Sequence, residues 1–134
     1  MKTGLWIDHR RAILVALTDK GEVTRVIESR AESQPRRSGE APLRGHYETR
    51  RVAMEDIHER EFADHLKVYY DEVIGCIRDA DSILLFGPGE AKDELQKRLA
   101  KNRLGDRVAA VETADKMTER QIEAKVRKYF RPSP

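Results

Sequence analysis

The sequence contains a single cysteine, Cys76, so no disulfide can form within the chain and a cysteine-based zinc site is excluded. Long apolar runs are also missing, since the longest covers only residues 12–17 and is far too short to cross a bilayer. The first residues lack the apolar region of a signal peptide. These absences predict a soluble cytoplasmic protein without a membrane partner.

A large excess of charge of one sign is absent as well. The 134 residues include 26 Lys+Arg and 24 Asp+Glu, which gives a formal net charge of +2. A uniformly basic coat is therefore excluded, whereas local basic patches are not. The length predicts a single domain over residues 1–134.

Hydrophobic patterning predicts three strands in the first thirty residues. Residues 5–7 form a short apolar run, and residues 12–17 are six consecutive apolar residues, as in a strand buried on both faces. Residues 19–21 form a turn that ends in a glycine, and Val23, Val26 and Ile27 indicate a third strand. The short turns predict an antiparallel meander.

Residues 31–52 break this pattern, with prolines, glycines and serines among charges, and predict a long, mobile loop. Segment 30–51 carries six Arg and three Glu but no Lys. Because Arg binds phosphates through its planar fork and stacks on bases, this loop favours RNA contact, with a well-solvated loop as the alternative. The candidate RNA-binding residues are Arg36, Arg37, Arg44, Arg50, Arg51 and Tyr47.

The C-terminal segment forms a second basic patch. Its cations are Lys116, Arg120, Lys125, Arg127, Lys128 and Arg131, against Glu119 and Glu123. A charged helix face is the alternative interpretation. Convergence of this patch with the Arg-rich loop on one face would favour RNA binding.

The rest of the chain alternates helices with strands. A helix is expected over about residues 54–79, because apolar residues recur there every three or four positions. They are Phe62, Leu66, Tyr69, Val73 and Ile77. Strands are expected over residues 82–86 and 108–111, separated by a helix over residues 90–103 with Gly105 as its C-cap.

The last helix begins at a capping box formed by Thr118 and Gln121, and Ile122, Val126 and Tyr129 mark its apolar face. The resulting order, β-β-β-α-β-α-β-α, predicts an α/β fold with a mixed five-stranded sheet and helices on both faces. Three antiparallel strands come first and two parallel strands follow. That layout is typical of ribonuclease H-like sheets and of the translational machinery component fold.

A Gly87-Pro88-Gly89 turn stands where a strand passes into a helix, and the ends of such strands bind ligands in α/β sheets. Together with Lys92 the turn is a candidate anion-binding site. It is neither a P-loop nor a dinucleotide-binding motif, and Glu90 would repel phosphate. A tight turn with a charged first helical turn is the alternative.

A ribonuclease H-like nuclease needs several carboxylates around two divalent metal ions. Asp8, at the end of the first strand, is suitably placed, and the long helix offers Glu55, Asp56, Glu59 or Glu61. The strand at 83–86 supplies no carboxylate. The alternative is that Asp8 caps a turn.

His58, Glu61 and His65 share a helix face, but the two histidines are about 10 Å apart along the helix axis, too far for one zinc ion. We expect a polar helix edge there and a core position for Cys76. The sequence therefore predicts no metal and no cofactor.

Residues 83–92, which read strand, Gly-Pro-Gly, two residues, Lys and then helix, resemble the middle domain of Pelota-like proteins and of the related archaeal release factors. The loop at 31–52 falls where that domain of release factors carries its Gly-Gly-Gln loop. The resemblance implies the translational machinery component fold and a translation-associated protein whose partner is the ribosome or a structured RNA.

The sequence has no Gly-Gly-Gln tripeptide, so the resemblance does not imply hydrolysis of peptidyl-tRNA. Pelota-like proteins also lack it and act in ribosome rescue without that step. Their N-terminal RNA-binding and C-terminal partner-binding domains have no expected counterpart here. We therefore expect a non-catalytic protein. A metal-dependent nuclease that uses Asp8 and a protein-interaction or homo-oligomerisation module are the alternatives.

Overall fold

The computed structural model describes residues 1–29 and 47–131, with side chains described for residues 1–29 and 59–131. The elements are β1 (Lys2–Ile7), β2 (Arg11–Thr18), β3 (Gly21–Glu28), α1 (Tyr47–Ile77), β4 (Ser82–Gly87), α2 (Ala91–Lys101), a 3₁₀ turn η1 (Gly105–Arg107), β5 (Val108–Thr113) and α3 (Glu119–Phe130). This order confirms the predicted one and adds η1 before β5.

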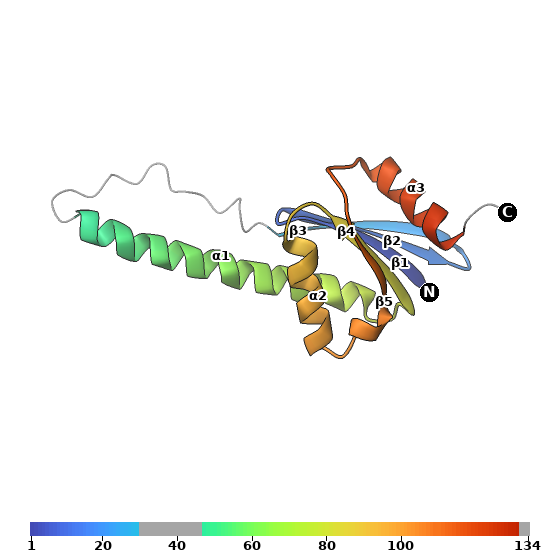
Figure 1. The fold of residues 1–134 in the computed structure, drawn as a ribbon, viewed down its shortest axis with the longest axis horizontal. Helices are drawn as coiled ribbons and strands as arrows, with labels where there is room; N and C mark the ends of the chain where they lie inside the picture. Colours follow the sequence, from blue (N-terminus) through green and yellow to red (C-terminus); the bar gives the residue numbers. More distant parts are fainter. Residues whose placement is uncertain (30–46, 132–134) are drawn as a thin grey trace.

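The five strands form one mixed sheet in the order β3-β2-β1-β4-β5. β2 is antiparallel to both β1 and β3, whereas β4 is parallel to β1 and β5. Helices α1 and α2 cover one face of the sheet and α3 covers the other (Figure 1). The predicted α/β architecture is confirmed.

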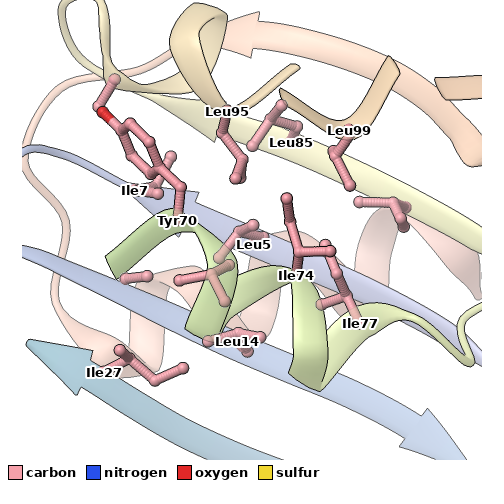
Figure 2. Packing of buried hydrophobic residues seen from close by; sticks show 14 of the residues in the cluster. Leu5, Ile7, Leu14, Ile27, Tyr70, Ile74, Ile77, Leu85, Leu95 and Leu99 are labelled. Carbon is pink, nitrogen blue, oxygen red and sulfur yellow. The ribbon is translucent and has the colours of Figure 1, made fainter. Parts of the chain in front are cut away.

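The larger core lies beneath α1 and α2. Leu5 pairs in register with Leu14 of β2 and with Leu85 of β4, so these three leucines share one face of the sheet. Ile74 of α1 and Leu95 of α2 pack on them, and all five are nearly or fully buried (Figure 2). The apolar stripe read from the sequence of α1 is thus the face that this helix buries.

The smaller core lies beneath α3. Trp6 and Phe86 point to this face and pack with Ile122 and Val126 of the helix. Gly4 of β1 permits the close approach, since a Cβ atom there would lie 2.1 Å from Val126 Cγ2. The predicted capping box starts α3, because the Thr118 side chain accepts from Gln121 N and the Gln121 side chain accepts from Thr118 N.

Helix α1 begins at Tyr47 rather than near Met54, so the last part of the loop expected at 31–52 is helical. The apolar stripe that located the helix starts only at Phe62. Residues 47–61 nevertheless contain no Gly or Pro and are rich in strong helix formers. The 31-residue helix is about 46 Å long, and its N-terminal half projects beyond the sheet (Figure 1).

Two local expectations for the helices are wrong. Arg103, with φ 63°, takes the left-handed position after α2 that was expected for Gly105. Leu104 N donates to Leu99 O, and both leucines belong to the larger core, so burial of Leu104 decides where the helix ends. Tyr129 of α3 is 39% exposed, and Phe130 packs against the smaller core instead.

In the two described ranges, no helix has both the length and the apolar character needed to cross a membrane.

Candidate functional site

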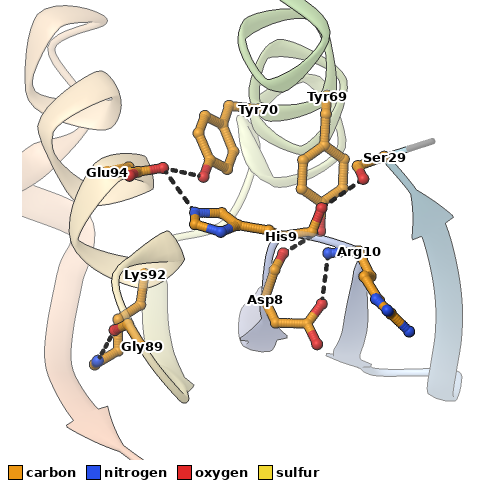
Figure 3. A network of polar contacts seen from close by, with 9 residues as sticks. All are labelled: Asp8, His9, Arg10, Ser29, Tyr69, Tyr70, Gly89, Lys92 and Glu94. Atoms are coloured by element: carbon orange, nitrogen blue, oxygen red, sulfur yellow. Dashed lines mark hydrogen bonds and ion pairs between the residues drawn. The ribbon is translucent and has the colours of Figure 1, made fainter. Parts of the chain in front are cut away.

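The carboxyl ends of β1 and β4 lie side by side, since Trp6 pairs with Phe86 in a parallel register. The loop after β1 and the turn after β4 therefore meet at one edge of the sheet, the edge where open α/β sheets bind ligands. Side chains from α1 and α2 join these segments in a polar network (Figure 3).

Asp8 caps the turn that leads from β1 to β2. Its Oδ1 accepts hydrogen bonds from the backbone N–H groups of Arg10 and Arg11, both at 2.8 Å. Asp8 thus caps a turn, which was the alternative to a role as a nuclease carboxylate. Among the residues with described side chains, no group of three His, Cys, Asp or Glu is placed to hold a metal ion. Glu55 and Asp56 lie outside that set.

Glu94 of α2 receives two side chains on one oxygen. Its Oε1 lies 3.1 Å from His9 Nε2 and accepts a hydrogen bond of 2.5 Å from the Tyr70 hydroxyl (Figure 3). Burial, and then the carboxylate of Glu94, raise the pKa of Tyr70 far above its ordinary value. The phenol therefore stays protonated and keeps donating, which joins α1 to α2.

Two side-chain hydroxyls donate hydrogen bonds to backbone carbonyls of the loop after β1. The hydroxyl of Tyr69 donates to Asp8 O at 3.0 Å, and Ser29 Oγ donates to His9 O at 2.5 Å. Burial raises the pKa of Tyr69 strongly, with further contributions from Asp8 and Tyr70. The network consequently fixes the geometry of this edge. Sequence reasoning missed it, because its members come from four separate segments without a common spacing.

Backbone geometry accounts for both glycines of the Gly-Pro-Gly turn. Gly87 has φ 149°, and a Cβ atom there would lie 2.2 Å from Ile7 O. Gly89 is left-handed with φ 66°. Lys92 is only 6% exposed, and its Nζ donates to Gly89 O at 2.6 Å (Figure 3). These contacts are those of a tight, self-closed turn, and anion binding by Gly87, Pro88, Gly89 and Lys92 stays a prediction.

The candidate RNA-binding arginines fall largely outside the described residues. Arg36, Arg37 and Arg44 lie in the segment that the structure does not describe. Tyr47, Arg50 and Arg51 belong to the first turns of α1, where only the backbone is described. Their contact with RNA stays a prediction.

Several charges of the C-terminal patch fasten α3 to the sheet. Lys125 Nζ pairs with Glu112 at 2.7 Å, Arg127 Nε lies 3.5 Å from Glu22, and Glu123 accepts from the Thr24 hydroxyl at 2.7 Å. Lys116, Arg120 and Lys128 are exposed. Because α1 and α3 lie on opposite faces, the fold does not bring the first turns of α1 onto this patch (Figure 1).

The remaining residues singled out in the sequence lie along α1. Glu61 is exposed and His65 is half-buried, whereas the side chain of His58 lies outside the described set. Cys76 packs at the edge of the larger core, as expected, and its Sγ accepts a hydrogen bond from Arg25 Nη1 at 3.3 Å.

The solved structures that resemble this chain include two translation proteins. Pelota of Thermoplasma acidophilum matches with a TM-score of 0.54 and 17% identity, over 98% of this chain and 32% of Pelota. The archaeal translation termination factor aRF1 matches with a TM-score of 0.50 and 14% identity, over 92% of this chain and 37% of that factor.

No family model matches the sequence, and no curated protein does. The chain spans about a third of the length of the two structures that it resembles. At these identities the similarity is one of fold. The predicted resemblance is thereby confirmed at that level: the chain has the fold of a Pelota/release-factor-like domain.

Proposed function

We propose that the chain acts in translation as a non-catalytic domain that binds the ribosome or a structured RNA. The observation that carries this proposal is the shared fold, which extends over 98% of the chain in the match to Pelota and over 92% in the match to aRF1. Nearly all of this chain therefore corresponds to structure present in both translation proteins.

The distribution of charge supports a nucleic-acid partner. The segment 30–51 concentrates Arg residues in a chain that is nearly neutral overall. The end of this segment lies in the part of α1 that projects beyond the sheet (Figure 1). Arg50 and Arg51 belong to this part of α1, and the planar fork of Arg binds phosphates in a salt-dependent way.

The proposal assigns no hydrolytic step to the chain. The Gly-Gly-Gln tripeptide is absent from the sequence. The carboxylate of Asp8, the best candidate for metal-dependent cleavage, is occupied by two backbone hydrogen bonds that shape a turn.

Sedimentation with purified ribosomes at about 50 mM and 200 mM salt tests the proposal, since phosphate contacts weaken steeply over that range. We expect wild-type chain to sediment with ribosomes at low salt and to be released at high salt. A variant with Arg36, Arg37, Arg44, Arg50 and Arg51 replaced by Ala should stay in the supernatant.

A charge-matched control replaces five exposed cations elsewhere, namely Arg60, Arg78, Lys116, Arg120 and Lys128, by Ala. This control should still sediment. Binding that is indifferent to ionic strength, or that survives loss of the five arginines of the basic segment, would overturn the electrostatic part of the proposal.

A further inference from the structure

A groove of about 300 Å³ runs between α1 and α2 and shares Tyr70 and Glu94 with the polar network at the sheet edge. Its lining comprises Ala63, Leu66, Lys67 and Tyr70 of α1 with Glu94, Lys97, Arg98 and Lys101 of α2. Four cations thus face the groove against one carboxylate, in a chain whose total charge is nearly balanced.

Two carboxylates beside the groove, Asp71 and Glu94, are already engaged. Asp71 forms a two-pronged ion pair with Arg98, with Nε–Oδ1 at 2.6 Å and Nη2–Oδ2 at 2.9 Å. The hydrogen bonds from Arg98 hold the pKa of Asp71 below its usual range, so the carboxylate stays charged. Glu94 faces Tyr70 and His9 (Figure 3).

Three of the four cations that line the groove are lysines. Lys67, Lys97 and Lys101 are exposed, and within residues 1–29 and 59–131 no carboxylate forms an ion pair with them. Lys97 and Lys101 are one helical turn apart, about 6 Å along α2, and Lys67 stands on the facing helix. The groove therefore carries positive charge on both of its walls, from Lys67 on α1 and from Lys97 and Lys101 on α2.

The uncharged residues that line the groove, here called its floor, are Ala63, Leu66 and Tyr70. Ala63 and Leu66 offer no hydrogen bond, and the hydroxyl of Tyr70, a residue only 4% exposed, is taken by Glu94. The floor therefore offers no free aromatic face for stacking and no group to read a base edge. A ligand is recognised here by its charge.

We propose that this groove holds the phosphodiester backbone of an RNA strand, with Lys67, Lys97 and Lys101 each neutralising a phosphate. The inference rests on the proposed function, which supplies RNA as the polyanion. An acidic peptide is the rival occupant. The planar fork of Arg serves carboxylates and phosphates alike, and the only Arg lining the groove is already paired with Asp71, whereas Lys binds phosphate as a point charge. Flexible lysines suit the repeated charges of a strand.

Fluorescence anisotropy with a labelled 20-nucleotide oligouridine, measured on the full chain over a range of salt, tests this site. The variant K67A/K97A/K101A should bind about tenfold or more weakly at low salt. Its plot of log K against log salt should be shallower by about 2, since each phosphate contact to a single strand contributes roughly 0.7. Ala favours the helix at these exposed positions, so the fold is retained, which urea unfolding checks.

A control with the same loss of charge, K20A/K116A/K128A, removes exposed lysines away from the groove and should bind oligouridine like the wild type. An equal loss of affinity for oligouridine in both variants would assign the effect to overall charge and overturn the proposed site. A slope of log K against log salt that is unchanged in the groove variant would also overturn it. Poly-L-glutamate that displaces oligouridine at equal charge concentration would make an acidic protein the partner instead.

The two proposals fail in different ways. Ribosome sedimentation that depends on the five arginines, combined with unaltered oligouridine binding by the groove variant, overturns the groove and leaves the proposed function intact. If oligouridine binding depends on the three lysines but the chain does not sediment with ribosomes, the ribosome is overturned as the partner. The groove then remains an RNA-binding site.

Discussion

Gly4 shows how one missing side chain sets the distance between two layers. A Cβ atom at this position would lie 2.1 Å from Cγ2 and 2.8 Å from Cγ1 of Val126, whose branched side chain is fully buried. Gly4→Ala should therefore push α3 off the sheet and lower the free energy of unfolding by about 1–3 kcal/mol. The midpoint of urea unfolding measures the change.

Gly75 is the matched control, since it lies in α1 with nothing within 4 Å of a built Cβ atom. Gly75→Ala should raise the free energy of unfolding by about 0.5–1 kcal/mol, because alanine restricts the unfolded chain and favours the helix. A Gly4→Ala variant as stable as wild type would show that α3 does not approach β1 so closely.

Asp71 provides a prediction about pH. Hydrogen bonds from Arg98 lower the pKa of this carboxyl in the folded state. A carboxyl with a lowered folded pKa stabilises the protein above its unfolded pKa of about 3.9, and that stabilisation is lost as the pH falls through the folded value. Asp71→Asn should cost less than about 1 kcal/mol at pH 7, because the pair is largely solvated.

The difference in urea midpoint between wild type and Asp71→Asn should be visible at pH 7 and should shrink as the pH falls through the lowered pKa of the folded carboxyl. A difference that stays constant, or that grows in acid, would show that the pair with Arg98 does not stabilise the fold.

The end of α2 is decided by competition between backbone strain and burial. Arg103 occupies the left-handed position with φ 63°, which brings Leu104 back over Leu99. Glycine adopts this conformation without the steric cost that a side chain imposes. Arg103→Gly should therefore raise the free energy of unfolding by about 1 kcal/mol, as read from the urea midpoint.

Ala100→Gly, one turn earlier inside the same helix, should lower the free energy of unfolding by about the same amount. Two glycine substitutions three residues apart are thus expected to act in opposite directions. Destabilisation by both would mean that Arg103 contributes more through its side chain than it loses through its backbone.

Helix α1 combines two segments with different reasons to be helical. From Phe62 onward its apolar stripe packs on the sheet, whereas the first half projects away from it (Figure 1). Proline breaks a helix at either place, at a cost of about 3 kcal/mol where the helix is needed. We expect Val73→Pro to abolish cooperative unfolding and Ala53→Pro to leave the free energy of unfolding, obtained from urea titration, within about 1 kcal/mol of wild type.

Circular dichroism should show loss of helix in both variants, which confirms that the proline acts locally. A large drop in the midpoint for Ala53→Pro would mean that the first half of α1 also stabilises the domain.

Sequence reasoning could find the features that depend on neighbouring residues, but not those that depend on tertiary packing. Local patterns located β2, the turn at Gly21 and the capping box of α3, because each depends on neighbours in the chain. The start of α1 was missed because the periodic apolar stripe that located the helix begins only at Phe62. The C-cap of α2 was missed because the hydrophobic contact of Leu104 outweighs the preference for glycine.

At the level of the whole molecule, the order of strands and helices was enough to predict a mixed five-stranded sheet with three antiparallel and two parallel strands, since connection rules leave few alternatives. The polar network and the groove could not be predicted from the sequence. His9, Tyr70 and Glu94 are separated by 85 and 24 residues in the pairs that make contact, and Lys67 faces lysines some thirty positions later. No spacing rule relates such residues until the packing of α1 on α2 is known.

The shape of the molecule carries the last prediction. A 134-residue chain folded into a compact body has a radius of gyration of about 14 Å, whereas α1 alone is about 46 Å long and extends beyond the sheet (Figure 1). Small-angle X-ray scattering of the monomer should therefore give a radius clearly above 14 Å and a distance distribution with a long tail. A value near 14 Å would mean that the start of α1 folds back on the domain in solution.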